Sequence, residues 1–276
     1  MRESRDAYAL FIDILGFADL VEIDSSIDGF VETMDDPHPT EIGRLVSHRF
    51  DAFHSVLQYQ MGQSSTRHVR TSLIFSDSAF IVTSVETDVF TFAVQLMRRL
   101  LRAGVPVRIG VGYGSFVAMR FFTDSFKHSD KHGCQFLGQS IVRSVRAESC
   151  GLPGCRIFLH PTTPLPSHHV KYQALPVPHI GMKCAVQHEL NYAHLNGEGM
   201  DPLIDPEFFS TELYDIDLTG NLGDLKNIAP TDKHYQYDET LSAINRMRAV
   251  YGRDPLPYDA RSRWNVAWPR FRQSKP

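Results

Sequence analysis

The amino-acid sequence predicts an α+β fold, in which helices pack on a mainly antiparallel β-sheet. Short apolar segments rich in β-branched and aromatic residues alternate with longer segments whose apolar residues recur at helical spacing. Two of the short segments lie close enough in the chain to form a hairpin. The predicted order is strand, two helices, two strands, helix and strand, followed by a further helix and strand.

The first part of the chain predicts one strand and two helices. Residues 7–15 are apolar and β-rich, and a helix is expected to begin at Phe17. An acidic, proline-containing stretch at residues 24–39 is interpreted as an insertion. Residues 41–61 place their apolar side chains on one face of a helix and predict the second one.

A hairpin and a long helix follow. Residues 68–75 and 79–84 are predicted strands, joined by a tip at residues 76–78. Residues 88–103 carry an apolar stripe at helical spacing and three arginines near the negative C-terminal end of the helix. Gly104 is expected to stop this helix.

The second half predicts a strand at residues 107–112, closed by the Tyr-Gly pair that follows it. We expect a helix at 138–150 and a strand at 155–160. Residues 170–191 have room for a further hairpin, and a last helix is predicted at about 237–251.

Length, charge and cysteine usage limit the classes of function. The 276 residues suffice for a domain, placed at 5–195, and an extension at 196–276. The net charge of −4 argues against a nucleic-acid polymer as partner. The four cysteines form no C-x-x-C pair and are typical of reduced thiols. The sequence shows no signal-peptide segment and no membrane-spanning apolar run, so we expect a cytoplasmic protein without a membrane partner.

Two aspartates lie at the ends of predicted strands, Asp13 within an apolar run and Asp77 at the tip of the hairpin. A carboxylate in an apolar segment is costly to desolvate unless it is paired or binds a metal. An aspartate at a strand end is also a common turn residue, because its side chain accepts hydrogen bonds from nearby backbone N–H groups. The two positions together predict a shared cation site.

Four segments in a fixed order carry a resemblance to a known family. They are Phe-Ile-Asp-Ile-Leu-Gly-Phe at 11–17, Phe-Ser-Asp-Ser at 75–78, Val-Arg-Ile-Gly-Val-Gly-Tyr-Gly at 107–114 and Gly-Gln-Ser-Ile-Val-Arg-Ser-Val-Arg-Ala-Glu at 138–148. Over roughly residues 7–190 the chain resembles class III nucleotidyl cyclases. The resemblance implies the class III cyclase fold, with a ferredoxin-like βαββαβ core, and a homodimer with its sites at the interface.

In this family the ribose 3′-oxygen of a nucleoside triphosphate attacks the α-phosphorus, and pyrophosphate leaves. The resemblance implies that Asp13 and Asp77, with the Ile14 carbonyl, hold two Mg²⁺ or Mn²⁺ ions, which prefer hard oxygen ligands. It also implies that Arg146 contacts the reacting phosphate, a role that suits a planar and permanently charged guanidinium. In the family's dimers the aspartates and the arginine come from opposite protomers.

Three further contacts are expected near this site. The backbone amides at Gly16 and Phe17, where a helix begins, are candidates for binding phosphate oxygens. Lys183 is a candidate for the lysine that binds the triphosphate in the family. Arg108 is expected to pack or pair structurally instead of contacting substrate.

Three positions depart from the family's pattern. Val142 stands where an asparagine usually orients the ribose. Leu73 and Gln135 stand where two polar residues usually select the purine, and they match neither the adenine nor the guanine pattern. Retained metal aspartates without purine-selecting residues resemble the pyrimidine (uridylate or cytidylate) cyclases of Pycsar anti-phage defence. Their cyclic nucleotide activates a separate effector protein.

The sequence therefore predicts a lyase that converts UTP to cyclic UMP, with CTP as the second choice. Gln135 offers both a donor and an acceptor to a pyrimidine edge, beside Leu73. One alternative is a purine cyclase with an unusual base pocket. Another is a cyclase-fold module that binds nucleotide or a partner without turnover. The joint presence of Asp13, Asp77 and Arg146 argues against this second alternative.

Overall fold

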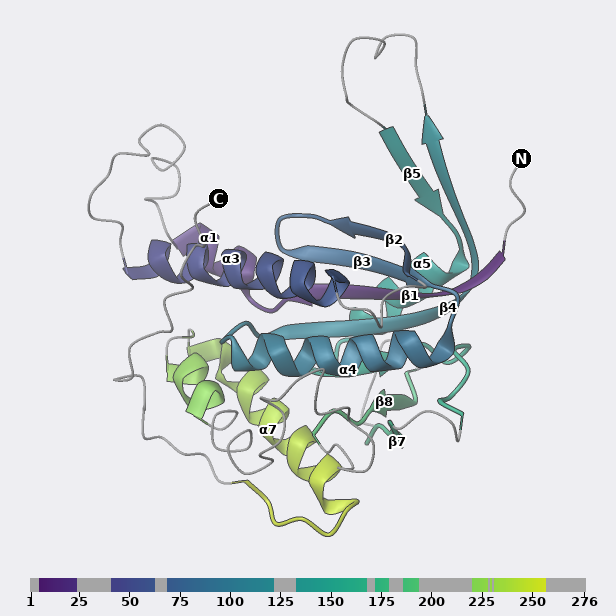
Figure 1. Ribbon diagram of the computed structural model, residues 1–276. Helices are drawn as coiled ribbons and strands as arrows, with labels where there is room; N and C mark the ends of the chain where they lie inside the picture. The colour runs from purple at the N-terminus through teal and green to yellow at the C-terminus, as the bar shows by residue number, and fades with distance from the viewer. Residues whose placement is uncertain are drawn as a thin grey trace, which may run out of the picture.

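An eight-stranded sheet forms the centre of the computed structural model, which describes residues 5–23, 41–62, 69–121, 133–167, 172–178, 186–193, 220–227, 229 and 231–256. The strand order is β2-β3-β1-β4-β6-β8-β7, and β5 pairs with β4 off this path (Figure 1). The strands are β1 (Arg5–Ile14), β2 (Val69–Ile74), β3 (Ser78–Thr83), β4 (Val107–Phe121), β5 (Gly133–Leu137), β6 (Ile157–Leu159), β7 (Ala174–Pro176) and β8 (His188–Leu190). The helices are α1 (Phe17–Ile23), α3 (Glu41–Gly62), α4 (Glu86–Arg102), α5 (Gln139–Glu148), the 3₁₀ turn η4 (Thr231–Lys233) and α7 (His234–Ala249), and residues 220–227 are also helical.

Strand pairing confirms the predicted α+β class and the ferredoxin-like core. β1 lies between β3 and β4 and is antiparallel to both, and β2 pairs antiparallel with β3. α3 connects β1 to β2, and α4 connects β3 to β4, which is the split β-α-β arrangement. The pairing of β4 with β6 is parallel, so the sheet is mainly antiparallel and not entirely so.

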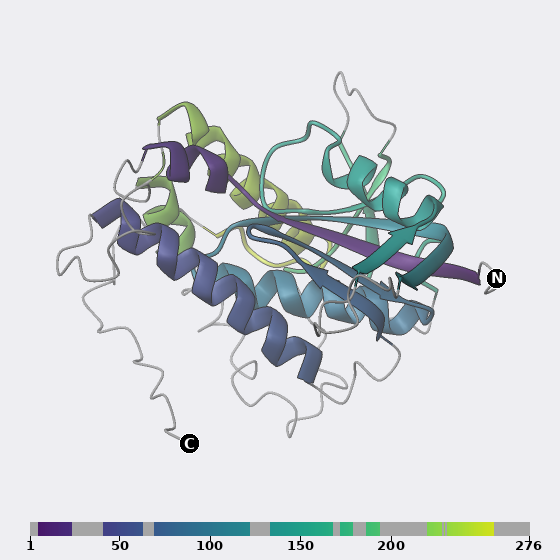
Figure 2. The ribbon, with the colours of Figure 1, turned by 90° about the horizontal axis from the view of Figure 1, so that it is seen from above.

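The two faces of β1 have different environments, because successive side chains point to opposite sides of a strand. Its even-numbered residues lie in the main core with side chains from α3, α4 and α7: Tyr8, Leu10, Ile12 and Ile14. Ala7 and Ala9 lie in a smaller cluster on the opposite face, with Ile141 of α5 packed against it. By alternation, Asp13 belongs to this second face. Figure 2 shows α5 and the α3–α4 pair on opposite sides of β1.

Close contact with β4 fixes the position of α5. A Cβ atom added to Gly110 would overlap the Ser144 carbonyl oxygen, and one added to Gly112 would overlap the Ser140 carbonyl oxygen. Ser140 and Ser144 are themselves fully buried. The backbone of the helix therefore rests directly on the backbone of the strand, and larger residues at the two glycines would displace α5.

One prediction of strand length is wrong. The strand expected to end at Gly112 continues to Phe121, with Tyr113 paired to Tyr8 and Gly114 paired to Ala7. Gly114 lies within the strand and has φ 149°, a conformation that L side chains rarely adopt, and a Cβ there would lie 2.6 Å from Arg143 Nη1 and 3.0 Å from Gln139 Cβ. The end of β4 and the unpredicted strand β5 form an arm that projects from the sheet (Figure 1).

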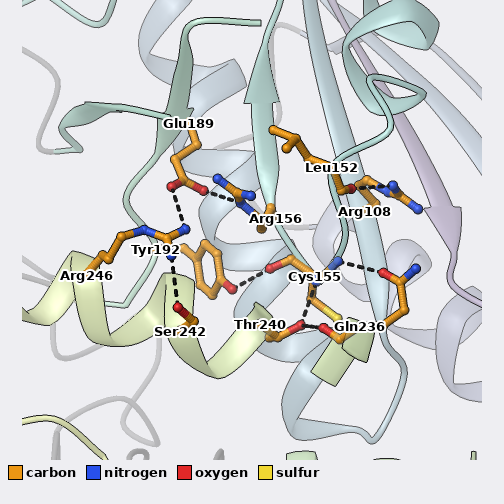
Figure 3. A network of polar contacts seen from close by, with 11 residues as sticks. Arg108, Leu152, Cys155, Arg156, Glu189, Tyr192, Gln236, Thr240, Ser242 and Arg246 are labelled. Carbon is orange, nitrogen blue, oxygen red and sulfur yellow. Dashed lines mark hydrogen bonds and ion pairs between the residues drawn. The ribbon is translucent and has the colours of Figure 1, made fainter. Parts of the chain in front are cut away.

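Two side chains of α7 accept hydrogen bonds from the backbone of the turn that precedes β6 (Figure 3). Gly154 N–H donates to Gln236 Oε1 over 2.7 Å, and Cys155 N–H donates to Thr240 Oγ1 over 2.8 Å. The Tyr192 hydroxyl donates to the Cys155 carbonyl over 2.5 Å. The main core also contains apolar residues of α7. The helix predicted at 237–251 thus packs against the sheet; the division into a domain at 5–195 and an extension stays a prediction.

A buried ion pair joins β8 to the start of β6. Arg156 Nε and Glu189 Oε2 lie 2.6 Å apart, and both side chains are 2% exposed. Arg246 of α7 lies 3.6 Å from the other carboxylate oxygen (Figure 3). The hairpin expected within 170–191 is present as β7 and β8, whereas the stretch at 24–39 lies outside the described residues. None of the described helices is both long and apolar enough to cross a bilayer.

Candidate active site

The two predicted metal-binding aspartates lie next to each other at one end of the sheet. Asp13 is paired with Ser78 of β3 and with Arg108 of β4. Asp77 lies in the turn between β2 and β3, and its carbonyl accepts a hydrogen bond from Ile14 N–H over 3.0 Å. The main chain of Ile14, the third predicted ligand, is therefore held against Asp77, while its side chain is buried in the core.

The region around Asp13 carries excess negative charge. Burial, followed by the charges of Glu148 and Asp77, raises the pKa of Asp13 to about 7, and Arg108 opposes this shift. Burial also raises the pKa of Glu148, although Arg108 lies 3.1 Å from its carboxylate. Asp13 and Glu148 thus share the Arg108 guanidinium, and the charge of Asp77 adds to theirs. A bound cation would offset this charge and favour the ionised form of Asp13.

Arg108 has the structural role expected for it. Besides the ion pair with Glu148, its Nη1 donates to the Leu152 carbonyl over 2.7 Å. Glu148 was not singled out from the sequence, because its contact with Arg108 joins α5 to β4 and leaves no local pattern. These contacts occupy Glu148 and leave the two aspartates as the candidates for metal binding.

The residues fit a metal that takes much of its coordination shell from substrate. The described part of the chain contains no group of three His, Cys, Asp or Glu side chains able to hold a metal by itself. Mg²⁺ is commonly bound through one or two carboxylates together with substrate phosphates and water. Asp13 and Asp77, with nearby carbonyl oxygens, provide a donor set of this kind.

The turn from β1 into α1 limits what Gly16 and Phe17 can do. Gly16 has φ 69°, a left-handed conformation that glycine adopts without strain. The Phe17 side chain is buried in the main core, so a phosphate could meet this residue only at its backbone. The predicted phosphate contact at these two residues stays a prediction.

Leu73, the first predicted base contact, lies beside an aromatic cluster. It is paired with Phe80, and the Phe80 ring lies 4.7 Å from Phe11, 5.8 Å from Phe136 and 6.2 Å from Phe75, measured between ring centroids. Phe75 is 47% exposed. Sequence analysis missed this cluster, although the spacing of Phe11 and Asp13 on one face of a strand was the available signal.

For two predicted substrate contacts, Gln135 and Lys183, the structure does not describe the side chain. Gln135 belongs to β5, opposite Met119 of β4, and its side chain lies outside the described ones. Lys183 lies in the segment 179–185, which is outside the described residues. Both roles stay predictions.

Arg146, the predicted phosphate contact, has its printed electrostatic partner outside the aspartate pair. It is exposed on α5, as is Val142 one turn earlier. Its charge is not among those that shift the pKa of Asp13. It lies instead near His160, whose pKa is lowered by burial and then by the charges of Arg143 and Arg146. The role predicted for Arg146 stays a prediction.

Comparisons with known proteins return nucleotidyl cyclases. No protein-family model matches the chain, and no similar sequence was found among curated proteins. The guanylyl cyclase Cya2 matches with 14% identity and a TM-score of 0.42, over 71% of this chain and 95% of that one. The dimeric guanylyl cyclase domain of the RhoGC fusion protein from the aquatic fungus Blastocladiella emersonii matches with 13% identity and a TM-score of 0.44, over 68% and 97%. The adenylyl cyclase CyaB from P. aeruginosa matches with 13% identity and a TM-score of 0.41, over 68% and 94%.

Proposed function

We propose that the protein is a nucleotidyl cyclase that converts a pyrimidine nucleoside triphosphate, UTP before CTP, to the 3′,5′-cyclic monophosphate and pyrophosphate. The observation that carries this proposal is the adjacency of Asp13 and Asp77 at the end of the sheet, in a region of uncompensated negative charge. Such a region is unfavourable for the protein alone and favourable for a divalent cation that arrives with a nucleotide.

In the proposed reaction Asp13 and Asp77 hold the metal, and the Ile14 carbonyl is a further oxygen ligand. Two bound Mg²⁺ or Mn²⁺ ions would supply positive charge that lowers the pKa of the 3′-hydroxyl and neutralises the phosphates. The partial burial of Asp13 keeps its carboxylate from being fully hydrated and thus strengthens its interaction with a cation. Arg146 donates hydrogen bonds to the phosphate oxygens on which negative charge grows.

The proposed site is composite and belongs to a homodimer. Arg146 is exposed and does not influence Asp13 within one chain, which supports a partner protomer as the source of the arginine. In a two-fold symmetric dimer each protomer then contributes the aspartates to one site and Arg146 to the other. The arm formed by β4 and β5 carries Gln135 and projects from the sheet, where a partner can reach it (Figure 1).

The base is proposed to bind on the aromatic cluster beside Leu73. Phe80 and the exposed Phe75 offer flat apolar surface for stacking, which any base accepts and which carries little selectivity by itself. Selectivity for a pyrimidine edge is assigned to Gln135, and binding of the triphosphate to Lys183. The product is proposed to act as a second messenger in the cytoplasm, where it activates a separate effector in anti-phage defence.

The experiment is a product assay with the purified protein. ATP, GTP, CTP and UTP are each incubated with Mn²⁺, and the products are identified by mass. We expect cyclic UMP as the main product, and no product in EDTA. Asp77→Asn should be inactive, whereas Asp51→Asn, which alters an exposed carboxylate on α3, should behave as wild type. Equal rates with ATP and UTP would overturn the specificity, and product formation in EDTA would overturn the metal mechanism.

A further inference from the structure

Three basic side chains gather on one side of α5, away from the aspartates. Arg143 and Arg146 lie three residues apart on the helix, so they lie on neighbouring positions of its surface. His160 follows β6 directly, and the charges of both arginines influence it. Sequence analysis singled out only Arg146 of these three.

Arg143 is held in place by the strand beneath it. Its Nη1 donates to the Tyr113 carbonyl over 2.7 Å, and the absence of a side chain at Gly114 leaves room for the guanidinium. A guanidinium has five N–H donors, and this contact uses one of them. The remaining donors of a half-buried, positioned arginine are available to a ligand.

His160 is also positioned, and in its neutral form it is a hydrogen-bond donor. Its backbone N–H donates to the Val111 carbonyl, and the Thr162 N–H lies 3.3 Å from Nδ1 and donates to it. The Thr162 hydroxyl lies 2.9 Å from the same nitrogen. Because Nδ1 accepts the backbone N–H, the proton of the neutral ring is assigned to Nε2.

Both of the charges that shift the pKa of His160 are positive. Burial, and after it the charges of Arg143 and Arg146, lower the pKa of His160, and no carboxylate of the described chain contributes to this shift. The two arginine charges lower the pKa of His160 and so favour its neutral form. An anion bound beside them would offset these charges and raise the pKa again, which favours the protonated form. The arrangement is therefore better suited to binding an anion than to stabilising the free protein.

We propose that Arg143, Arg146 and His160 form one binding surface for a polyphosphate chain, namely the triphosphate of the nucleotide or the pyrophosphate that leaves it. The proposal rests on the proposed function for the role of Arg146 and assigns new roles to the other two residues. Guanidinium groups bind phosphate oxygens through two parallel hydrogen bonds, and neighbouring arginines can engage successive phosphates of a chain. His160 Nε2 adds a third donor; when the approaching phosphates favour protonation of the ring, the new proton on Nδ1 is donated to the Thr162 hydroxyl, 2.9 Å away, in place of the contact with the Thr162 N–H.

The test uses inorganic pyrophosphate as the probe and the full-length protein in EDTA, so that metal binding at the aspartates does not contribute. Calorimetry measures affinity, and NMR of isotope-labelled histidine side chains follows the titration of His160. We expect pyrophosphate to raise the pKa of His160, and Arg146→Gln to raise it in the absence of ligand. Arg143→Gln, Arg146→Gln and His160→Gln should each weaken pyrophosphate binding by about 10–150-fold, the size expected for one charge-assisted contact.

Arg253→Gln is the matched control, because Arg253 is an exposed arginine beyond α7. It should change the affinity less than about two-fold, the small effect expected of a remote exposed charge. His160→Asn is a second variant in case His160→Gln does not fold, and circular dichroism checks both. The proposed binding surface would be wrong if folded His160 and Arg143 variants bound pyrophosphate with unchanged affinity, or if the wild-type protein bound no pyrophosphate. If the variants lose pyrophosphate binding but the wild-type protein cyclises no nucleotide, the binding surface is supported and only the proposed function is wrong.

Discussion

Two arginine–glutamate pairs in this protein are buried in different electrostatic surroundings. Arg156 and Glu189 are each 2% exposed, and Arg246 adds a second positive charge beside Glu189. Arg108 and Glu148 are 15% and 9% exposed, and Asp13 and Asp77 add two negative charges nearby. The first group, two arginines around one glutamate, carries an excess of positive charge and connects β6, β8 and α7. The second leaves negative charge in excess, which costs stability and suits a cation.

Breaking the Arg156–Glu189 pair has the largest expected effect. Glu189→Gln leaves Arg156 buried without its counter-charge, and removing one partner of a buried pair costs about 3–5 kcal/mol. The free energy of unfolding in urea should fall by this amount. Asp238→Asn is the control, because its pair with Lys226 is exposed and such pairs contribute about 0–1 kcal/mol. Equal losses in the two variants would contradict the comparison.

Asp77→Asn addresses the uncompensated region. An amide is a neutral, weaker ligand for a hard cation, so kcat should fall by about 10²–10³-fold, as when a single electrostatic contact to a transition state is lost. Urea unfolding should stay close to wild type, because Asp77 lies in a turn outside the core clusters. Full activity together with reduced stability would show that Asp77 has a structural role.

Mixing two inactive variants tests whether the acidic region needs the partner's arginine. Asp77→Ala and Arg146→Ala homodimers each lack one part of both sites. A mixed dimer has one complete site, and half of randomly exchanged dimers are mixed, so activity should recover to about a quarter of wild type. Co-expression with two affinity tags verifies that mixed dimers form. No recovery in confirmed mixed dimers would place the site within one chain.

Asp13→Asn should stabilise the metal-free protein against unfolding. Because the folded-state pKa of Asp13 is raised to about 7, the penalty for ionising it is absent below the unfolded pKa of about 3.9 and complete above pH 7. In EDTA the variant should therefore unfold at a higher temperature than wild type at pH 8, and at a similar temperature at pH 4. Each kcal/mol corresponds to roughly 2–4 °C in Tm. The same Tm difference at both pH values would show that ionisation of Asp13 is not its cause.

Local patterns predicted most of the fold. The apolar stripe of α4 and the strand around Asp13 were recognisable because periodicity reflects which side chains face the core. The continuation of β4 beyond Gly112 was not recognisable, because a glycine after a tyrosine resembles a turn. In the structure Gly114 lies within the strand, where α5 approaches closely. β5 was missed along with it, because it pairs with this continuation.

Local patterns pointed to a candidate site residue only where it conflicts with its neighbourhood, whereas Arg146, Gln135 and Lys183 were expected from the family resemblance. Asp13 stood out as a carboxylate in an apolar run, and the structure sets Asp77 beside it. Glu148 and His160 lie in ordinary helix and strand-end contexts, and their partners come from other elements. Such contacts depend on the register and packing of the sheet and leave no signal in a local window of sequence.

The link between α7 and the turn before β6 has a consequence for how the chain is made. The acceptors for the Gly154 and Cys155 N–H groups lie 82 and 85 residues later in the sequence. On a ribosome, β6 emerges well before these side chains, so the two backbone donors before it stay without these acceptors until α7 has been made. Contacts of such long sequence separation also slow folding once the chain is complete. We therefore expect the turn before β6 to become ordered late in synthesis, with the Cys155 side chain buried only after α7 has docked.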